Sequence, residues 1–191
     1  MKGAPPLAAA PRRVLGFDPG SRRTGFGVVE RSGNSFRALD HGAIAPPARL
    51  DLAHRLHAIA RGARETIAEW RPDAIVVEEA FYHDSVRSTL VLGHVRGALL
   101  VAAVEAGVPV AEYTPREIKL SVAGNGGATK EQVAFMVRRL LGVKGALSPD
   151  AADALAAALT HLHRARQSEP ARAVSAAARN LEALLARKGA R

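Results

Sequence analysis

The chain has 191 residues, the length of one ordinary domain, and 48% of them are hydrophobic, which is enough for a folded core. It contains no cysteine, which excludes disulfides and thiolate metal sites and fits a cytoplasmic location, and we find no stretch long and apolar enough to predict a membrane span. The net charge of +9 favours a polyanionic partner, but most of the excess lies in residues 1–13 and 164–191, which we expect to be a disordered extension and a basic, disordered tail around one folded domain at 14–163.

The first half of the domain predicts a meander followed by a helix and a buried strand. Three strands are expected in close succession at Arg13–Phe17, Phe26–Arg31 and Phe36–Ile44, with glycine-rich turns that favour antiparallel pairing. From Leu52 to Trp70 the apolar residues recur at the spacing of an amphipathic helix. The continuous apolar run Ala74–Val77 then predicts a strand buried on both faces, parallel to the first strand.

The second half predicts alternating helices and one more strand. We expect a helix from about Ser85 to Ala106, a short strand at 109–113, helices that begin at Thr114 and Thr129, and a buried, alanine-rich helix at 148–162. Gly93 and Gly97 lie one turn apart on the first of these helices, which suggests close backbone packing against the sheet or against a second subunit. The predicted fold class is therefore α/β, with a mixed five-stranded sheet and helices on both faces.

Acidic residues follow two of the expected strands. Asp18 comes directly before Pro19-Gly20, which would end the first strand; in isolation, an aspartate that hydrogen-bonds its own turn is the alternative interpretation. Glu78 and Glu79 end the fourth strand, and strand alternation does not decide which of the two points to a site. Because these strands are expected to be parallel, their acids meet at one edge of the sheet.

Two further acids begin the last core helix. Asp150 and Asp153 are three residues apart and so share one helix face, although Asp150 alone is equally explained by the helix dipole. Together with Asp18 and Glu78 they form a group of four carboxylates on three elements, and we find no local cation to pair with them. Such a group is costly unless it binds metal, and oxygen-only ligands indicate Mg²⁺, or Mn²⁺ in its place. Two such ions about 4 Å apart serve phosphodiester hydrolysis.

Candidate nucleic-acid contacts surround these acids in the sequence. Lys119 and Lys130 flank the glycine-rich loop 124–127 and can hold phosphates, although solvated surface lysines are the default interpretation. Phe81 follows Glu78-Glu79 in a chain poor in aromatic residues and can stack on bases or belong to the core. Arg96 on the glycine-containing helix is a further phosphate candidate.

These motifs, in this order, resemble the RuvC Holliday junction resolvases. The resemblance runs from about residue 14 to 163, and its motifs are Asp18-Pro19-Gly20-Ser21-x-x-Thr24-Gly25, then Val77-Glu78, Lys119, Gly124-x-Gly126, Lys130, and Asp150-Ala-Ala-Asp153-Ala-Leu-Ala. It implies a ribonuclease-H-like nuclease domain, a homodimer and paired, symmetric nicks in four-way junction DNA that leave 5′-phosphate and 3′-hydroxyl ends.

The resemblance also assigns roles to residues. It implies that Asp18, Glu78, Asp150 and Asp153 are catalytic and hold two Mg²⁺ ions, with the direct role of the last two less clearly divided, since some members place a histidine near them. Lys119, Lys130 and Phe81 match DNA-contacting positions of the family. The family works with the RuvA–RuvB branch-migration complex in recombination and repair and prefers short T-rich sequences. The extension and the tail match nothing in the family pattern.

Two other functions fit part of the pattern. Actin-like and sugar-kinase ATPases also place Asp-x-Gly after a strand, but they need a second glycine-rich phosphate loop in a second subdomain, for which this chain is too short. A junction-binding protein without chemistry is the other alternative. Four retained acids argue against it, because a protein that only binds phosphates has no use for them.

Overall fold

The computed structural model describes residues 12–79 and 85–168. Phe81, the extension before residue 12 and the tail beyond residue 168 lie outside the described residues. The strands are β1 (Arg13–Asp18), β2 (Thr24–Ser32), β3 (Ser35–Ile44), β4 (Ala74–Glu78) and β5 (Val110–Tyr113). The helices are α1 (Leu52–Trp70), α2 (Val86–Glu105), α3 (Pro115–Ala123), α4 (Lys130–Leu141) and α5 (Pro149–Ser168). The last helix therefore extends past the predicted domain boundary at residue 163.

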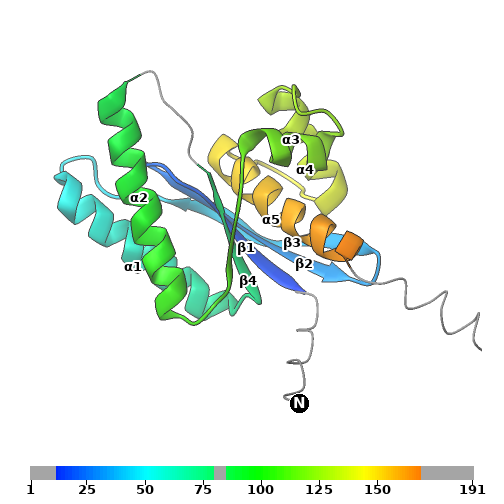
Figure 1. The fold of residues 1–191 in the computed structure, drawn as a ribbon, viewed down its shortest axis with the longest axis horizontal. Helices are drawn as coiled ribbons and strands as arrows, with labels where there is room; N and C mark the ends of the chain where they lie inside the picture. The colour runs from blue at the N-terminus through cyan, green and yellow to red at the C-terminus, as the bar shows by residue number, and fades with distance from the viewer. Residues whose placement is uncertain (1–11, 80–84, 169–191) are drawn as a thin grey trace, which may run out of the picture.

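The strands form one mixed sheet in the order β3-β2-β1-β4-β5. The pairs β1–β2 and β2–β3 are antiparallel, and the pairs β1–β4 and β4–β5 are parallel. Figure 1 shows α1 and α2 on one side of this sheet and α3, α4 and α5 on the other. The predicted fold class, with its meander, its parallel strands and helices on both faces, is confirmed.

Strand alternation divides the interior into two cores. Leu15 and Phe17 of β1 point to the α1–α2 side, whereas Val14 packs with Leu155 and Leu159 of α5 on the other side. The central strands are buried on both faces, which explains why β4 is a continuous apolar run. This double packing fixes the strand ends, and with them the side chains that follow.

Glycines in β1 and β2 bring α5 unusually close to the sheet. A Cβ atom on Gly16 would lie 2.0 Å from the backbone oxygen of Ala154, and one on Gly25 would lie 2.1 Å from the backbone oxygen of Asp150. The helix backbone therefore rests directly on the strand backbones, which is possible only where the strand has no side chain. The first turns of α5 are placed by this contact.

We expect Gly16→Ala to destabilise the protein because its methyl group would displace α5 from β1. Overpacking of this kind costs about 1–3 kcal/mol of unfolding free energy. Urea denaturation of the full chain measures the loss. Gly127→Ala is the control, since its nearest atom is the Asn125 side-chain oxygen at 3.4 Å. Equal stability of the two variants would contradict this account of α5.

Helix α2 excludes one of two alternatives for its glycines and corrects one expectation. Gly93 and Gly97 face open space within the chain, so they do not serve close packing against the sheet. The expectation that no segment is long and apolar enough to span a membrane also does not hold for α2, which passes that test by length and composition, with a mean hydropathy of 1.3. One face of α2 is nevertheless packed in the core, through Val95, Leu99 and Ala102.

Candidate functional site

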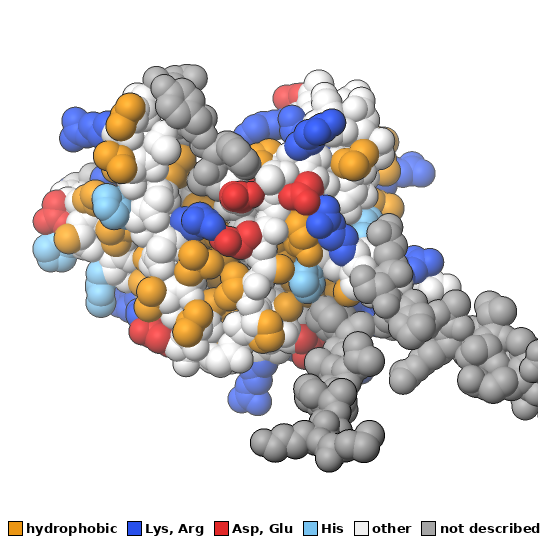
Figure 2. Space-filling view, viewed as in Figure 1, with side chains coloured by type: hydrophobic (Ala, Val, Ile, Leu, Met, Phe, Trp, Pro, Cys, Tyr) orange, Lys and Arg blue, Asp and Glu red, His pale blue; other side chains and the backbone are white. Residues whose placement is uncertain are grey.

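A cavity of about 510 Å³ lies at the carboxyl ends of β1 and β4, between α2 on one side and α3 and α4 on the other. Figure 2 shows acidic and basic side chains close together in and below the notch between these two halves. The cavity collects all four predicted acids, both predicted lysines and two further charged residues. Its charged lining residues are Asp18, Glu78, Glu79, Asp150, Asp153, Arg23, Lys119 and Lys130.

Sheet register places Asp18 beside Glu78. Asp18 is the last residue of β1, and the preceding Phe17 pairs with Val77 of the parallel strand β4, so both acids follow at the same edge. Burial, together with the negative charges of Glu78 and Asp153, raises the pKa of Asp18 to about 8. Burial and Asp153 likewise raise the pKa of Glu78 to about 7. The raised pKa values of Asp18 and Glu78 indicate that negative charge is concentrated at this end of the cavity.

The two acids of α5 have basic partners, which corrects the expectation of an unpaired cluster. The Nε atom of Arg23 donates to Asp150 Oδ2 at 2.9 Å, and Lys130 Nζ donates to Asp153 Oδ2 at 3.4 Å. Burial raises the pKa of Asp153 although Lys130 opposes this, and the charge of Asp153 raises the pKa of Lys130. Both partners come from other elements of the fold, so their proximity is not visible in the sequence.

The donor set fits hard divalent cations. All four predicted ligands are carboxylates, the side chains that Mg²⁺ and Mn²⁺ prefer. The raised pKa values of Asp18 and Glu78 mark negative charge that a cation would balance. Within residues 12–79 and 85–168, no three acidic or histidine side chains converge closely enough to hold one ion, and Asp150 and Asp153 are bonded to basic side chains instead. A metal would therefore have to replace those bases.

The pKa of Asp18 predicts how stability depends on pH in the absence of metal. Between its ordinary pKa of 3.8 and its raised pKa of about 8, the folded protein holds a proton that the unfolded chain has lost. The folded state binds more protons, so stability falls as pH rises through this window. We expect the Tm of the full chain in EDTA to decrease as the pH is raised from about 5 to about 8, which lies within this window. Asp18→Asn should make this fall shallower, and identical slopes would contradict the assignment.

The predicted DNA-contacting residues have different positions. Lys119 of α3 and Lys130 at the start of α4 both line the cavity. Arg96 does not line it, because its guanidinium forms an ion pair with Glu112 of β5. Phe81 lies outside the described residues, so its role stays a prediction.

Sequence reasoning missed two groups of cavity residues. Arg23 belongs to the Arg22-Arg23 pair inside the first motif, and the presence of a base so close to Asp18 was the available signal. The sequence did not decide which of Glu78 and Glu79 points to the site. In the structure both residues line the cavity. Apolar walls complete the site, and their positions follow only from the packing of helices: Leu92, Pro115, Ile118 and Val133.

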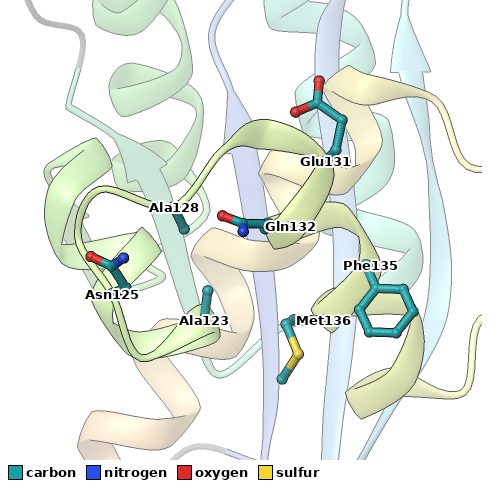
Figure 3. Close-up of a pocket in the computed structure, with 7 residues that line it drawn as sticks. All are labelled: Ala123, Asn125, Ala128, Glu131, Gln132, Phe135 and Met136. Atoms are coloured by element: carbon teal, nitrogen blue, oxygen red, sulfur yellow. The ribbon is translucent and has the colours of Figure 1, made fainter.

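A second cavity, of about 440 Å³, opens on the outer side of α3 and α4. Figure 3 shows Phe135, Met136 and Gln132 of α4 around it, with Asn125 and Ala128 from the loop before α4. None of the predicted site residues that the structure describes lines this cavity. Among the described residues, Glu131 is its only acidic lining residue, so the cavity lacks the group of carboxylates that distinguishes the first one.

Comparison with known proteins places this geometry in a family. The sequence profile of the family described as "Crossover junction endodeoxyribonuclease RuvC" matches residues 14–161, which include all four acids. The chain belongs to the RuvC family. A relative with the same name from Halorhodospira halophila (strain DSM 244 / SL1) is 48% identical over 167 residues, which cover 87% of this chain and 98% of that protein.

Solved structures agree with the family assignment. T. thermophilus RuvC, in a complex with a Holliday junction substrate, superimposes with a TM-score of 0.77 at 41% identity, covering 82% of this chain and 96% of that one. The yeast mitochondrial Holliday junction resolvase Ydc2 superimposes with a TM-score of 0.62 at 13% identity, covering 85% of this chain and 83% of that one, and so supports the fold alone. These neighbours confirm the ribonuclease-H-like fold.

Proposed function

We propose that this RuvC family member is a divalent-metal-dependent endonuclease that resolves Holliday junctions in recombination and repair. The observation that carries the proposal is the group of four carboxylates from three elements at one sheet edge, in a cavity that also contains two lysines. The T. thermophilus relative, which was solved with a junction substrate, supports four-way DNA as the ligand.

Asp18, Glu78, Asp150 and Asp153 would hold two Mg²⁺ ions, or Mn²⁺ in their place. When bound, the two ions supply an activated water and stabilise the leaving oxygen of an in-line displacement. The four carboxylates would balance the charge of the cations, and Asp18 and Glu78 are largely buried at the strand ends. Attack of a water oxygen on phosphorus, with breakage of the P–O3′ bond and protonation of the leaving 3′ oxygen, would give 5′-phosphate and 3′-hydroxyl ends that a ligase can join.

Lys119 and Lys130 would bind the DNA backbone at the mouth of the cavity. Each carries a positive charge on a helix that borders the acids, and phosphate neutralisation by such side chains supplies much of the affinity for DNA. We include Phe81 as a base-stacking residue and Arg96 as a phosphate contact with weaker support, since Arg96 would first have to leave Glu112.

We also propose that the protein works as a homodimer through α2. Val86, Leu90, Val101 and Val104 are 66%, 61%, 53% and 71% exposed. Their positions, together with Gly93 and Gly97, are spaced by four, three, four, four and three residues, so they form one stripe along the helix. A second copy of the stripe would cover these apolar side chains, and the glycines would let the two backbones approach.

The remaining parts of the proposal concern the cell. The chain would act in the cytoplasm after the RuvA–RuvB complex has moved the junction, and the basic residues beyond 163 would add non-specific affinity for DNA.

The deciding experiment is a cleavage assay on a synthetic four-way junction, with both strand pairs mapped. The full chain with Mg²⁺ is expected to make symmetric nicks in two opposing strands, to leave ends that ligate, and to do nothing in EDTA. A linear duplex of the same sequence is the control. Cleavage of the duplex at an equal rate would favour a different nuclease of this fold, and activity in EDTA would contradict the metal site.

A further inference from the structure

Arg23 lies at the acidic cavity but has no part in the proposed hydrolysis. It belongs to the turn between β1 and β2, and its Nε atom donates to Asp150 Oδ2 at 2.9 Å. The turn is tight, because Thr24 Oγ1 donates to the backbone oxygen of Gly20 at 2.8 Å. A Cβ atom on Gly20 would lie only 2.1 Å from the Arg23 oxygen. The backbone of Arg23 is therefore held in one place.

Asp150 is also fixed in position next to this turn, by the packing of α5. It lies in the first turn of α5, where the contact with Gly25 leaves no room for even a methyl group. Gly25 comes two residues after Arg23 and packs directly on the backbone of Asp150. Backbone packing therefore fixes the positions of both partners of the ion pair. The fold therefore places Arg23 next to Asp150. The ion pair does not depend on the flexibility of the long arginine side chain alone.

A divalent cation can displace this arginine. The side chains of Arg23 and Asp150 are 55% and 31% exposed, and ion pairs this accessible to water are weak. A doubly charged ion that also binds Asp18 and Glu78 interacts with Asp150 more strongly than one screened guanidinium does. Once released, the guanidinium remains at the wall of the cavity that Lys119 also lines. Its planar set of N–H donors matches a phosphate group.

We propose that Arg23 is a metal-displaced phosphate contact, which holds Asp150 in the metal-free protein and binds a DNA phosphate when a cation takes that carboxylate. The inference rests on the proposed function. It implies an order of binding: the cation binds Asp150 first, and the released guanidinium of Arg23 is then available to a phosphate of the DNA backbone. The neighbouring Arg22 is exposed and is not among the residues that line the cavity, so it provides a matched control.

The first test is calorimetric titration of the full chain with Mn²⁺ in the absence of DNA. Arg23→Ala is expected to bind Mn²⁺ about two- to fivefold more tightly than the wild type, the size of one exposed ion pair, because no arginine has to be displaced. Arg22→Ala should bind as the wild type does. Failure of the wild type to bind Mn²⁺ would contradict the proposed function itself. Wild-type binding that Arg23→Ala leaves unchanged or weakens would overturn only the displacement.

The second test is the affinity for a four-way junction, measured in EDTA and in Ca²⁺, which also binds oxygen ligands. Arg23→Ala is expected to weaken binding about tenfold in Ca²⁺, the size of one charge-assisted hydrogen bond, and to change it little in EDTA. Equal losses in the two conditions, or an equal loss for Arg22→Ala in Ca²⁺, would overturn the proposal. Thermal unfolding of each variant verifies that the fold is intact.

Discussion

Asp18→Asn is expected to abolish junction cleavage and to leave junction binding intact. Asp18 ends β1 inside the cavity, next to Glu78 and within the field of Asp150 and Asp153, so it would hold the metal together with these acids. Removing its charge should lower the cleavage rate by about 10²–10³-fold or more, the scale of losing one group that stabilises charge in the transition state. Binding should persist, because Lys119 and Lys130 at the cavity are unchanged.

Single-turnover cleavage and fluorescence anisotropy on the same junction measure the two properties. Asp51→Asn is the matched control, since Asp51 is an exposed helix cap on α1 and asparagine caps helices equally well. Cleavage by Asp18→Asn at the wild-type rate in Mg²⁺ would contradict the metal site. Loss of binding together with cleavage would show that Asp18 has a structural part in the DNA-binding surface. A wild type that binds junctions without cutting them would favour the non-catalytic alternative.

The fold was predictable from sequence because its signals are local. The apolar run that forms β4 is too short for a helix and ends in acids, and Thr129 with Gln132 forms the capping box that starts α4. Gly142 follows that helix with a positive φ of 64°, a conformation that glycine adopts at helix ends without strain. Each of these features depends on residues within a few positions of one another, which is the range where sequence patterns are informative.

The site was only partly predictable because its charges come from distant elements. Asp18 and Glu78 could be grouped, since parallel strands bring their carboxyl ends to one edge of the sheet, whereas Asp150 and Asp153 were added to the group from their spacing on one helix and from the resemblance to the family. The bases that pair with them could not: 127 residues separate Arg23 from Asp150, and 23 separate Lys130 from Asp153. The same holds for Arg96, whose partner Glu112 is on another element. Pairings of this kind follow from packing, which no local pattern records.

Helix α2 gives the second large effect, on the oligomeric state. Leu90→Glu and Val101→Glu each place a charge on the exposed apolar stripe, where a second copy of the chain would bury it without a partner. Each is expected to weaken the dimer by about 30-fold or more, which corresponds to the loss of one interface anchor of about 2 kcal/mol. Light scattering over a dilution series measures the shift from dimer to monomer.

Leu120→Glu is the control for this experiment, because Leu120 of α3 is 58% exposed, close to the value for Leu90, but lies off the stripe. It should leave the dimer intact. The consequence for catalysis is specific: if each subunit cuts one strand, the monomeric variants should give single nicks, whereas the dimer cuts two opposing strands within one encounter. A wild type that is monomeric at every concentration, or that binds lipid vesicles through α2, would contradict the dimer. Cuts in two opposing strands by a variant shown to be monomeric would mean that junction resolution does not require the dimer.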